Sequence, residues 1–397
     1  MTKFPFTLRI ISCVVIASVS SQPLQAKGLT FAPEVLAQIG FDDNVFLLAD
    51  EESASEIIGS ESRSDTVIDL GAGFDAEYEG DIHTIEVNAD AYISEYLDFD
   101  VLDFTGVDVD ATWNWNGGKR INTELGYDFK RDQSNFSEEN LAQGDLFNRS
   151  RAHFQVNFIA SKSNEVYLRS SAQTKDYEIR DQLENDVFDV VVGYRRESPL
   201  GNSVGFEISR TEGDFPNRLA FSTTFESLED YTQDQATFKI DWKPSNKSRL
   251  RADIGYIDRE HNSQLSEFDV SDLVYDFRFT WDIGRRTELN AQLVREIRDT
   301  ENVLTLFNEE DRFKIDGAWR VTRKLTVSSA VTFRDVDFIQ SGFTREDSAT
   351  LFEAAVQYDL NRRSAFEFTF TTRTRDSTSV TNEFDNNFVL LNYRRRL

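Results

Sequence analysis

The sequence predicts an all-β protein, a transmembrane antiparallel up-and-down β-barrel of about 18 strands. Three observations support this fold class. Apolar and polar residues alternate almost continuously, tight turns recur at a nearly regular spacing, and the runs between them are long. Runs of about 10 to 14 residues exceed the usual strand length of about 5 to 6 and are long enough to cross a bilayer at a tilt.

The first 26 residues are predicted to be a cleaved signal peptide. Lys3 and Arg9 give a positive start, residues 10–19 form a short apolar segment, and Ala26 is a small residue at the cleavage site. The apolar segment is too short for a stable membrane anchor. The sequence therefore predicts a signal peptide over 1–26 and an outer-membrane barrel over 27–397. The single cysteine, Cys13, would leave with the signal peptide, so no thiol chemistry is expected.

The predicted strands have two unlike faces. In residues 249–256 (RLRADIGY), every second residue from Leu250 onward is apolar, and Arg249, Arg251 and Asp253 lie between them. In hydrocarbon every backbone N–H and C=O must be paired internally, which a closed barrel achieves and an open sheet does not. The apolar face is therefore expected to contact lipid. The opposite parity would place Arg at the bilayer midplane, at a cost of about 2 to 4 kcal/mol each.

Eight tight turns, each preceded by an aromatic residue, divide the chain into hairpins. Trp242, Trp281, Trp319 and Tyr358 precede four of them, at intervals of 39, 38 and 39 residues. Eight such turns, with both chain ends on the turn side, give nine hairpins and so about 18 strands. The aromatic residues are expected to form a girdle at the membrane interface. This predicted girdle consists of Tyr78, Trp115, Phe158, Tyr194, Trp242, Trp281, Trp319 and Tyr358.

Longer polar connections are predicted between the tight turns. They are expected at 42–64, 132–146 and 212–230 and around Asn262, Glu309, Ser341 and Ser377. Short turns at one end and long loops at the other are typical of outer-membrane barrels. The segments 42–64 and 212–230 are the candidate plugs of the lumen. The acidic clusters at 50–52, 137–139 and 309–311 are predicted to be solvated loop tips, with weak divalent-cation bridging to lipopolysaccharide as the alternative.

Other β architectures fit the sequence less well. A repeat near 39 residues also suits a β-propeller blade of about 40 to 45 residues. A blade packs four short strands into that length, whereas two long strands fill it here. The final segment supports a barrel, because Val389, Leu391, Tyr393 and Leu397 share one parity, although Arg395 interrupts it. A barrel is therefore favoured over a propeller or an extended β-helix.

Charged residues on the second parity are predicted to line a wet lumen. They can pair across strands and stabilise the barrel, or they can bind the hydroxyl groups of a polar solute. An 18-strand barrel is wide enough for an aqueous channel. The candidate lumen-lining residues are Asp69, Asp75, Glu124, Asp128, Arg249, Arg251, Asp253, Asp316, Arg320, Arg334, Glu353 and Glu367.

The sequence offers little sign of catalysis, metal binding or a cofactor. His83, His153 and His261 have no spacing that signals a catalytic triad or a metal site, and structural roles are favoured. Asp42-Asp43-Asn44 could offer oxygen ligands to Ca²⁺, but a polar strand end is the simpler interpretation. The formal charge of −27 argues against nucleic acid as a partner.

Four segments resemble a known family. These are residues 41–46 (FDDNVF), 210–218 (RTEGDFPNR), 242–250 (WKPSNKSRL) and 255–261 (GYIDREH). They are similar to β-barrel porin proteins of bacterial exopolysaccharide gene clusters, in particular the exosortase-associated EpsL type. The resemblance is best over residues 200–340 and departs at 282–284 (DIG), where a Pro/Thr-Gly-Lys turn is expected.

The resemblance implies a non-enzymatic role at the outer membrane in exopolysaccharide biosynthesis or export, as a conduit or a docking barrel. A general porin for small polar solutes is the alternative, and a catalytic barrel is a third. The expected partners are outer-membrane lipid and lipopolysaccharide, the barrel-assembly machinery, polysaccharide and periplasmic export components.

Overall fold

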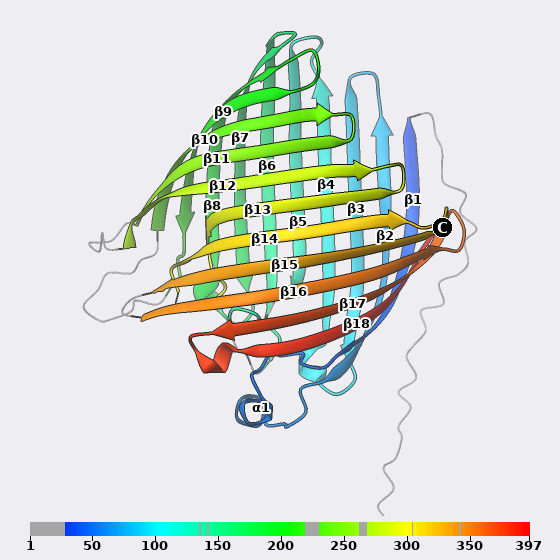
Figure 1. Ribbon diagram of the computed structural model, residues 1–397, viewed down its shortest axis with the longest axis vertical. Helices are drawn as coiled ribbons and strands as arrows, with labels where there is room; N and C mark the ends of the chain where they lie inside the picture. Colours follow the sequence, from blue (N-terminus) through cyan, green and yellow to red (C-terminus); the bar gives the residue numbers. More distant parts are fainter. Residues whose placement is uncertain are drawn as a thin grey trace, which may run out of the picture.

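The described part of the chain folds as a closed barrel of 18 antiparallel strands with its connections (Figure 1). The computed structural model describes residues 28–397 except 135, 140, 142, 219–229, 262–267, 304 and 341–342. Each strand pairs with its neighbours in sequence, and β1 closes the ring by pairing with both β2 and β18. The predicted fold class is confirmed. The predicted signal peptide, residues 1–26, lies outside the described residues.

The strand lengths agree with the long runs of alternation. The strands are β1 Leu29–Asp42, β2 Asp65–Glu79, β3 His83–Tyr96, β4 Phe104–Asn116, β5 Ile121–Gln133, β6 Leu146–Ser161, β7 Asn164–Tyr177, β8 Asn185–Glu197, β9 Ser203–Asp214, β10 Asp230–Ser245, β11 Ser248–His261, β12 Val270–Ile283, β13 Thr287–Arg298, β14 Phe307–Arg320, β15 Leu325–Gln340, β16 Phe343–Asp359, β17 Ser364–Ser377 and β18 Phe384–Arg396. In Figure 1, β10 to β18 cross in front of the earlier strands, as tilted strands on opposite walls of a barrel do.

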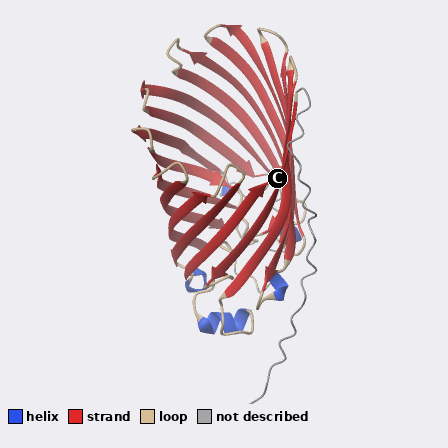
Figure 2. Ribbon diagram, turned by 90° about the vertical axis from the view of Figure 1, so that its right-hand side faces the viewer, coloured by secondary structure: helices blue, strands red, loops and turns tan. Residues whose placement is uncertain are grey.

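Helical structure is confined to the connections, as Figure 2 shows. Within the described ranges it includes the helix α1 Glu51–Ile57 and the short 3₁₀ segments η1 Asp100–Leu102, η2 Asp181–Leu183 and η4 Val380–Asn382. Among the described residues, no helix combines the length and the apolar character needed to cross a membrane.

The two ends of the barrel differ as expected. Tight turns join β2 to β3, β4 to β5 and so on to β17, and the longer connections lie at the other end. Gly284, in the β12–β13 turn, has a φ of 79°, which a Gly adopts without strain. The prediction of a connection around Glu309 is wrong. The connection between β13 and β14 runs over residues 299–306, and Glu309 lies within β14. The one expected around Ser341 lies outside the described residues.

The seam of the barrel lies between β1 and β18. Asp43 accepts hydrogen bonds from the backbone N–H (2.6 Å) and side-chain Nδ2 (2.8 Å) of Asn387. Asn44 is 1% exposed, and its side chain accepts from the backbone N–H of Leu48 and donates to its carbonyl. Of the oxygen atoms considered as Ca²⁺ ligands, those of Asp42 and Asp43 therefore accept hydrogen bonds from β18, and that of Asn44 orders its own loop.

The outer face of the barrel is apolar. Exposed side chains such as Leu70, Phe238, Phe313 and Phe368 lie mid-strand, at alternate positions that match across neighbouring strands. Phe368, which is 47% exposed, lies opposite Val356 on β16 and Leu391 on β18. A contiguous face of exposed apolar side chains is unfavourable in water, so this face is suited to contact with lipid acyl chains.

Replacing Phe368 with Arg is expected to destabilise the folded barrel by about 2 to 4 kcal/mol, because the guanidinium would enter hydrocarbon. Thr369→Arg, one residue along β17 on the opposite face, is the matched control and should cost little. Urea unfolding in liposomes, followed by heat-modifiable gel mobility, measures both. Equal losses in the two variants would contradict this assignment of faces.

Candidate functional site

The connection between β5 and β6, residues 134–145, crosses the lumen in its described residues 134, 136–139, 141 and 143–145. In a ring of 18 strands this connection starts diametrically opposite β14 and β15. Its residue Glu138 nevertheless contacts Arg298 at the end of β13 and Arg334 on β15. The carbonyl of Glu138 accepts from Arg345 on β16 at 2.9 Å, and that of Ser137 accepts from Arg375 on β17. The segment is here called the crossing loop, and it narrows the barrel interior.

Glu138 holds the crossing loop in place. One carboxylate oxygen lies 2.6 Å from Nη2 of Arg298 and 3.7 Å from Nη2 of Arg334. The other accepts from Thr300 Oγ1 at 2.9 Å and from the backbone N–H of Glu301 at 2.6 Å. Glu138 is only 6% exposed, so the prediction of a solvated loop tip at 137–139 is wrong for this residue. The carboxylate is buried because cations and donors on the far wall compensate it.

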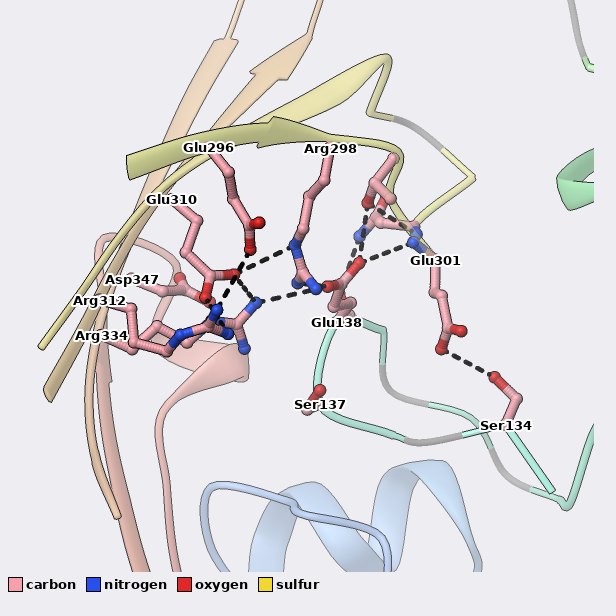
Figure 3. A network of polar contacts seen from close by, with 12 residues as sticks. Ser134, Ser137, Glu138, Glu296, Arg298, Glu301, Glu310, Arg312, Arg334 and Asp347 are labelled. Atoms are coloured by element: carbon pink, nitrogen blue, oxygen red, sulfur yellow. Dashed lines mark hydrogen bonds and ion pairs between the residues drawn. The ribbon is translucent and has the colours of Figure 1, made fainter. Parts of the chain in front are cut away.

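Glu310, the next carboxylate along this wall, is paired with three arginines (Figure 3). Its oxygens lie 3.1 Å from Arg298, 3.2 Å from Arg312 and 2.8 Å from Arg334. The residue is 1% exposed on the inner face of β14. The prediction of a loop tip at 309–311 is therefore wrong, because arginines on β13, β14 and β15 neutralise the carboxylate and the strand continues through it. Arg298 and Arg334 join the Glu138 and Glu310 contacts into one network.

A second set of contacts holds both ends of the crossing loop, Ser134 and Asp145. Arg180, in the β7–β8 connection, lies 2.7 Å from Asp145 and donates to Ser134 Oγ and to the Glu301 carbonyl. Glu301 in turn lies 2.7 Å from Lys175 and accepts from Ser134 at 3.2 Å. The connections 134–145, 178–184 and 299–306 are therefore linked by charge.

Acid is expected to loosen this linkage. Burial tends to raise the pKa of Glu301, but Lys175, Arg180 and the Ser134 hydroxyl outweigh it and lower the pKa below its ordinary 4.5. A depressed carboxyl pKa stabilises the folded state fully above pH 4.5, and this contribution is lost as pH falls through the folded pKa. Proteolytic cleavage of residues 134–145 should therefore accelerate below pH 4.5. The isosteric Glu301→Gln variant should show a weaker pH dependence, and an unchanged profile in that variant would contradict the assignment.

An apolar cluster lies at the loop end. Phe46 and Leu48 of the β1–β2 connection are fully buried with Leu102, Phe136 of the crossing loop and Phe384. The segment 42–64, one of the two predicted plugs, thus packs against the crossing loop. The other prediction, 212–230, falls largely on residues 219–229, outside the described residues. The crossing loop itself was not predicted as a plug, since its acidic sequence carries no periodicity.

A polar recess of about 390 Å³ lies on the inner wall toward the turn end, lined from seven consecutive strands, β6 to β12. Lys239 Nζ lies 3.2 Å from Glu207 and 3.0 Å from Asp253. The Tyr167 hydroxyl donates to Glu207 at 2.5 Å. Arg251, at the same wall, lies 3.7 Å from Asp241. Fixed donors and acceptors in alternation make this surface complementary to a solute rich in hydroxyl groups.

The predicted lumen residues are spread around the ring rather than gathered at one site. Arg251 and Asp253 line the recess, and Arg249 pairs with Asp241 beside it. Arg334 belongs to the Glu138–Glu310 network. The other contacts are Asp69 with Ser94, Asp75 with Arg396, Glu124 with His153, Asp128 with Arg149 and Asp316 with Asn290. Arg320 lies beside the β12–β13 turn, and Glu353 and Glu367 alternate with the exposed Phe352 and Phe368.

The predicted girdle residues lie at the turn ends of their strands. Seven are more than 40% exposed, and Trp115 is half-buried. His83 begins β3, where its Nδ1 accepts from Trp113 Nε1 at 3.2 Å, and His261 ends β11, where its ring stacks on Phe307. The membrane-interface role of the girdle stays a prediction.

Recess residues missed by the sequence reasoning include Tyr167, Glu207, Lys239 and Asp276. All lie on the inward parity of their strands, so the alternation that identified Arg251 and Asp253 could have identified them. The alternation could not show which of these strands contribute side chains to the same recess. Glu138 carried no such signal.

Comparisons with known proteins agree with the barrel. Residues 244–397 match the model of the family described as "Putative beta-barrel porin 2". No curated protein matches the chain. Pseudomonas aeruginosa OccK2 (OpdF) has a similar structure, with 11% identity, 92% of this chain and 98% of that chain covered, and a TM-score of 0.52. A BenF-like porin from Pseudomonas fluorescens Pf-5 has 12% identity, the same coverage of 92% and 98%, and a TM-score of 0.50. The chain is thus a porin-like β-barrel, and this fold points to the bacterial outer membrane.

Proposed function

We propose that the protein is a non-enzymatic outer-membrane conduit for hydroxyl-rich polar solutes, and that its solute belongs to exopolysaccharide biosynthesis or export. The observation that carries the proposal is the inner-wall recess, whose alternating carboxylates, cations and Tyr167 hydroxyl face one space. Carbohydrates are bound by such paired donors and acceptors, because each hydroxyl both donates and accepts.

The crossing loop supports a restricted rather than a free passage. It lies between the recess and the loop end, and it is held on the far wall by Arg298, Arg334, Arg345 and Arg375. A solute that passes the recess therefore meets a loop that can move only when several charged contacts break. Restricted passage fits a conduit or docking barrel that works with periplasmic components, as the resemblance of residues 200–340 implies.

A general porin for small polar solutes is the second candidate. It is favoured by the likeness to solved porins, one of which, OccK2, has been solved in complex with glucuronate. In a general porin the crossing loop would set a size limit, and the barrel would conduct without any partner.

Liposome swelling with neutral sugars of graded size separates these functions. A general porin should admit mono- and disaccharides with a sharp cutoff. The proposed conduit should swell slowly with all sugars until the crossing loop is released. Normal polysaccharide secretion by a strain lacking the gene would remove the exopolysaccharide assignment, and hydrolysis of ester or peptide substrates would contradict the non-enzymatic role.

A further inference from the structure

The two ends of the barrel carry opposite charge. The eight tight turns contain ten basic residues and a single carboxylate, Asp81, whereas the nine longer connections contain 22 Asp and Glu against three Arg. The ten basic residues are Lys119, Arg120, Lys162, Lys247, Arg285, Arg286, Arg323, Lys324, Arg362 and Arg363. They are here called the basic rim. The whole chain has a formal charge of −27, so this local excess of positive charge is opposite in sign to the overall charge.

The basic rim is not neutralised by the protein. Within the part of the chain that the structure describes, none of its ten cations has a carboxylate oxygen within 4 Å. Arg286 and Lys324 donate only to the backbone carbonyls of Val321 and Leu360. By contrast, the arginines that stabilise the barrel interior are paired with carboxylates, as Arg298 and Arg334 are with Glu310. Unpaired like charges repel and leave a positive potential over the barrel mouth.

Arg320 continues the basic rim onto the inner wall of the barrel. Arg320 alternates with the exposed Trp319 on β14 and lines a small recess together with Arg285 and Arg286. Further in, Arg251 and Arg278 line the larger recess, where each is paired with a carboxylate, Asp241 and Asp276. Phospholipid headgroups surround the outside of a barrel and do not reach its inner wall. Because Arg320 lies on the inner wall beside Arg285 and Arg286, the rim faces the interior of the barrel, which favours a solute that enters the barrel over a lipid surface.

We infer that the basic rim captures an acidic glycan, one that carries carboxylates or phosphates, and feeds it into the barrel from the periplasmic side. The inference rests on the proposed conduit function and adds to it the charge of the solute and its side of entry. Short turns lie on the periplasmic side of such barrels. A positive entrance concentrates a polyanion, and an acidic loop end binds it weakly and so favours its exit.

Binding of a labelled oligogalacturonate to the full barrel in non-ionic detergent tests the inference. One variant replaces the six cations of three turns with Gln: R285Q, R286Q, R323Q, K324Q, R362Q and R363Q. The matched control keeps the charge at the same positions: R285K, R286K, R323K, K324R, R362K and R363K. These side chains have no carboxylate partner, so both variants should fold, which heat-modifiable gel mobility verifies. Fluorescence anisotropy measures affinity over a series of salt concentrations, with a dextran oligomer of equal length as the neutral probe.

The parent barrel and the charge-keeping control should bind oligogalacturonate, with an affinity that falls steeply as the salt concentration rises. The parent and both variants should fail to bind dextran. The Gln variant should bind at least about tenfold more weakly, with a flatter salt dependence. Equal affinity of parent and Gln variant would overturn the inference. The inference would also be overturned if native mass spectrometry showed phosphatidylglycerol bound to the parent but not to the Gln variant, and neither bound oligogalacturonate. Sugar flux that persists without such binding would refute only the capture surface. Binding without any flux would refute the conduit instead.

Discussion

Replacing Glu138 with Gln is expected to release the crossing loop and to raise the swelling rate of proteoliposomes in sugar solutions several-fold. The carboxylate pairs with Arg298 and Arg334 and accepts from Thr300 and the backbone of Glu301. A neutral amide of the same shape loses both ion pairs, and the N–H groups of its Nε2 face the donors already present. Hydrogen bonds to charged groups contribute about 1.5 to 3 kcal/mol each. A loss of that size shifts the docked-to-released ratio of the loop by about 10- to 150-fold.

The matched control is Glu51→Gln, which removes one carboxylate from the exposed first turn of α1. Its swelling rate should equal that of the parent barrel. Arg345 and Arg375 still hold backbone carbonyls of the loop in the Glu138→Gln variant. A variant in which residues 136–143 are replaced by a short Gly-Ser linker should therefore swell faster still. If the parent and both loop variants swell at one rate, the crossing loop does not restrict passage.

The wall of the barrel was largely predictable from the sequence, and its interior was not. The alternation of apolar and charged residues within one strand is enough to identify lipid-facing residues such as Leu70 and Phe368. Successive side chains of a strand point to opposite faces, so every second residue lies on the same face. Aromatic residues before tight turns located all eight turns, including the one at Gly284 that departs from the expected family pattern. These signals are local, so one sequence is enough to read them.

The interior depends on contacts between residues that are distant in sequence. Glu310 sits in an acidic triplet that is typical of a loop, and it lies in a strand because Arg298 and Arg334 on the neighbouring strands compensate it. Glu138 has a polar, aperiodic neighbourhood, and its partners lie 160 residues or more further along the chain. Neither pairing leaves a trace in periodicity, which reports only on a strand's own two faces.

Replacing Glu310 with Ala is expected to destabilise the barrel more than any other single charge removal on this wall. The variant would leave Arg298, Arg312 and Arg334 near one another on the inner face without their shared carboxylate. Breaking one partner of a buried ion pair costs about 3 to 5 kcal/mol when the remaining charge stays desolvated. The loss expected here is at or below the lower end of that range, because the three arginines are partly exposed and keep contacts with Glu138 and Glu296. The urea midpoint of unfolding, read from heat-modifiable gel mobility, should fall accordingly.

Glu309→Ala is the matched control, since Glu309 precedes Glu310 on β14 and contacts Arg295, which Asp272 and Asp311 also contact. A partly exposed pair of this kind contributes about 0 to 1 kcal/mol. The double variant Glu310→Ala with Arg334→Met should recover part of the loss, because it removes one of the cations that lost the Glu310 carboxylate and fills its space with an apolar side chain. If the double variant is less stable than Glu310→Ala alone, then repulsion among the arginines is not the cause of the loss, and packing by the Arg334 side chain is.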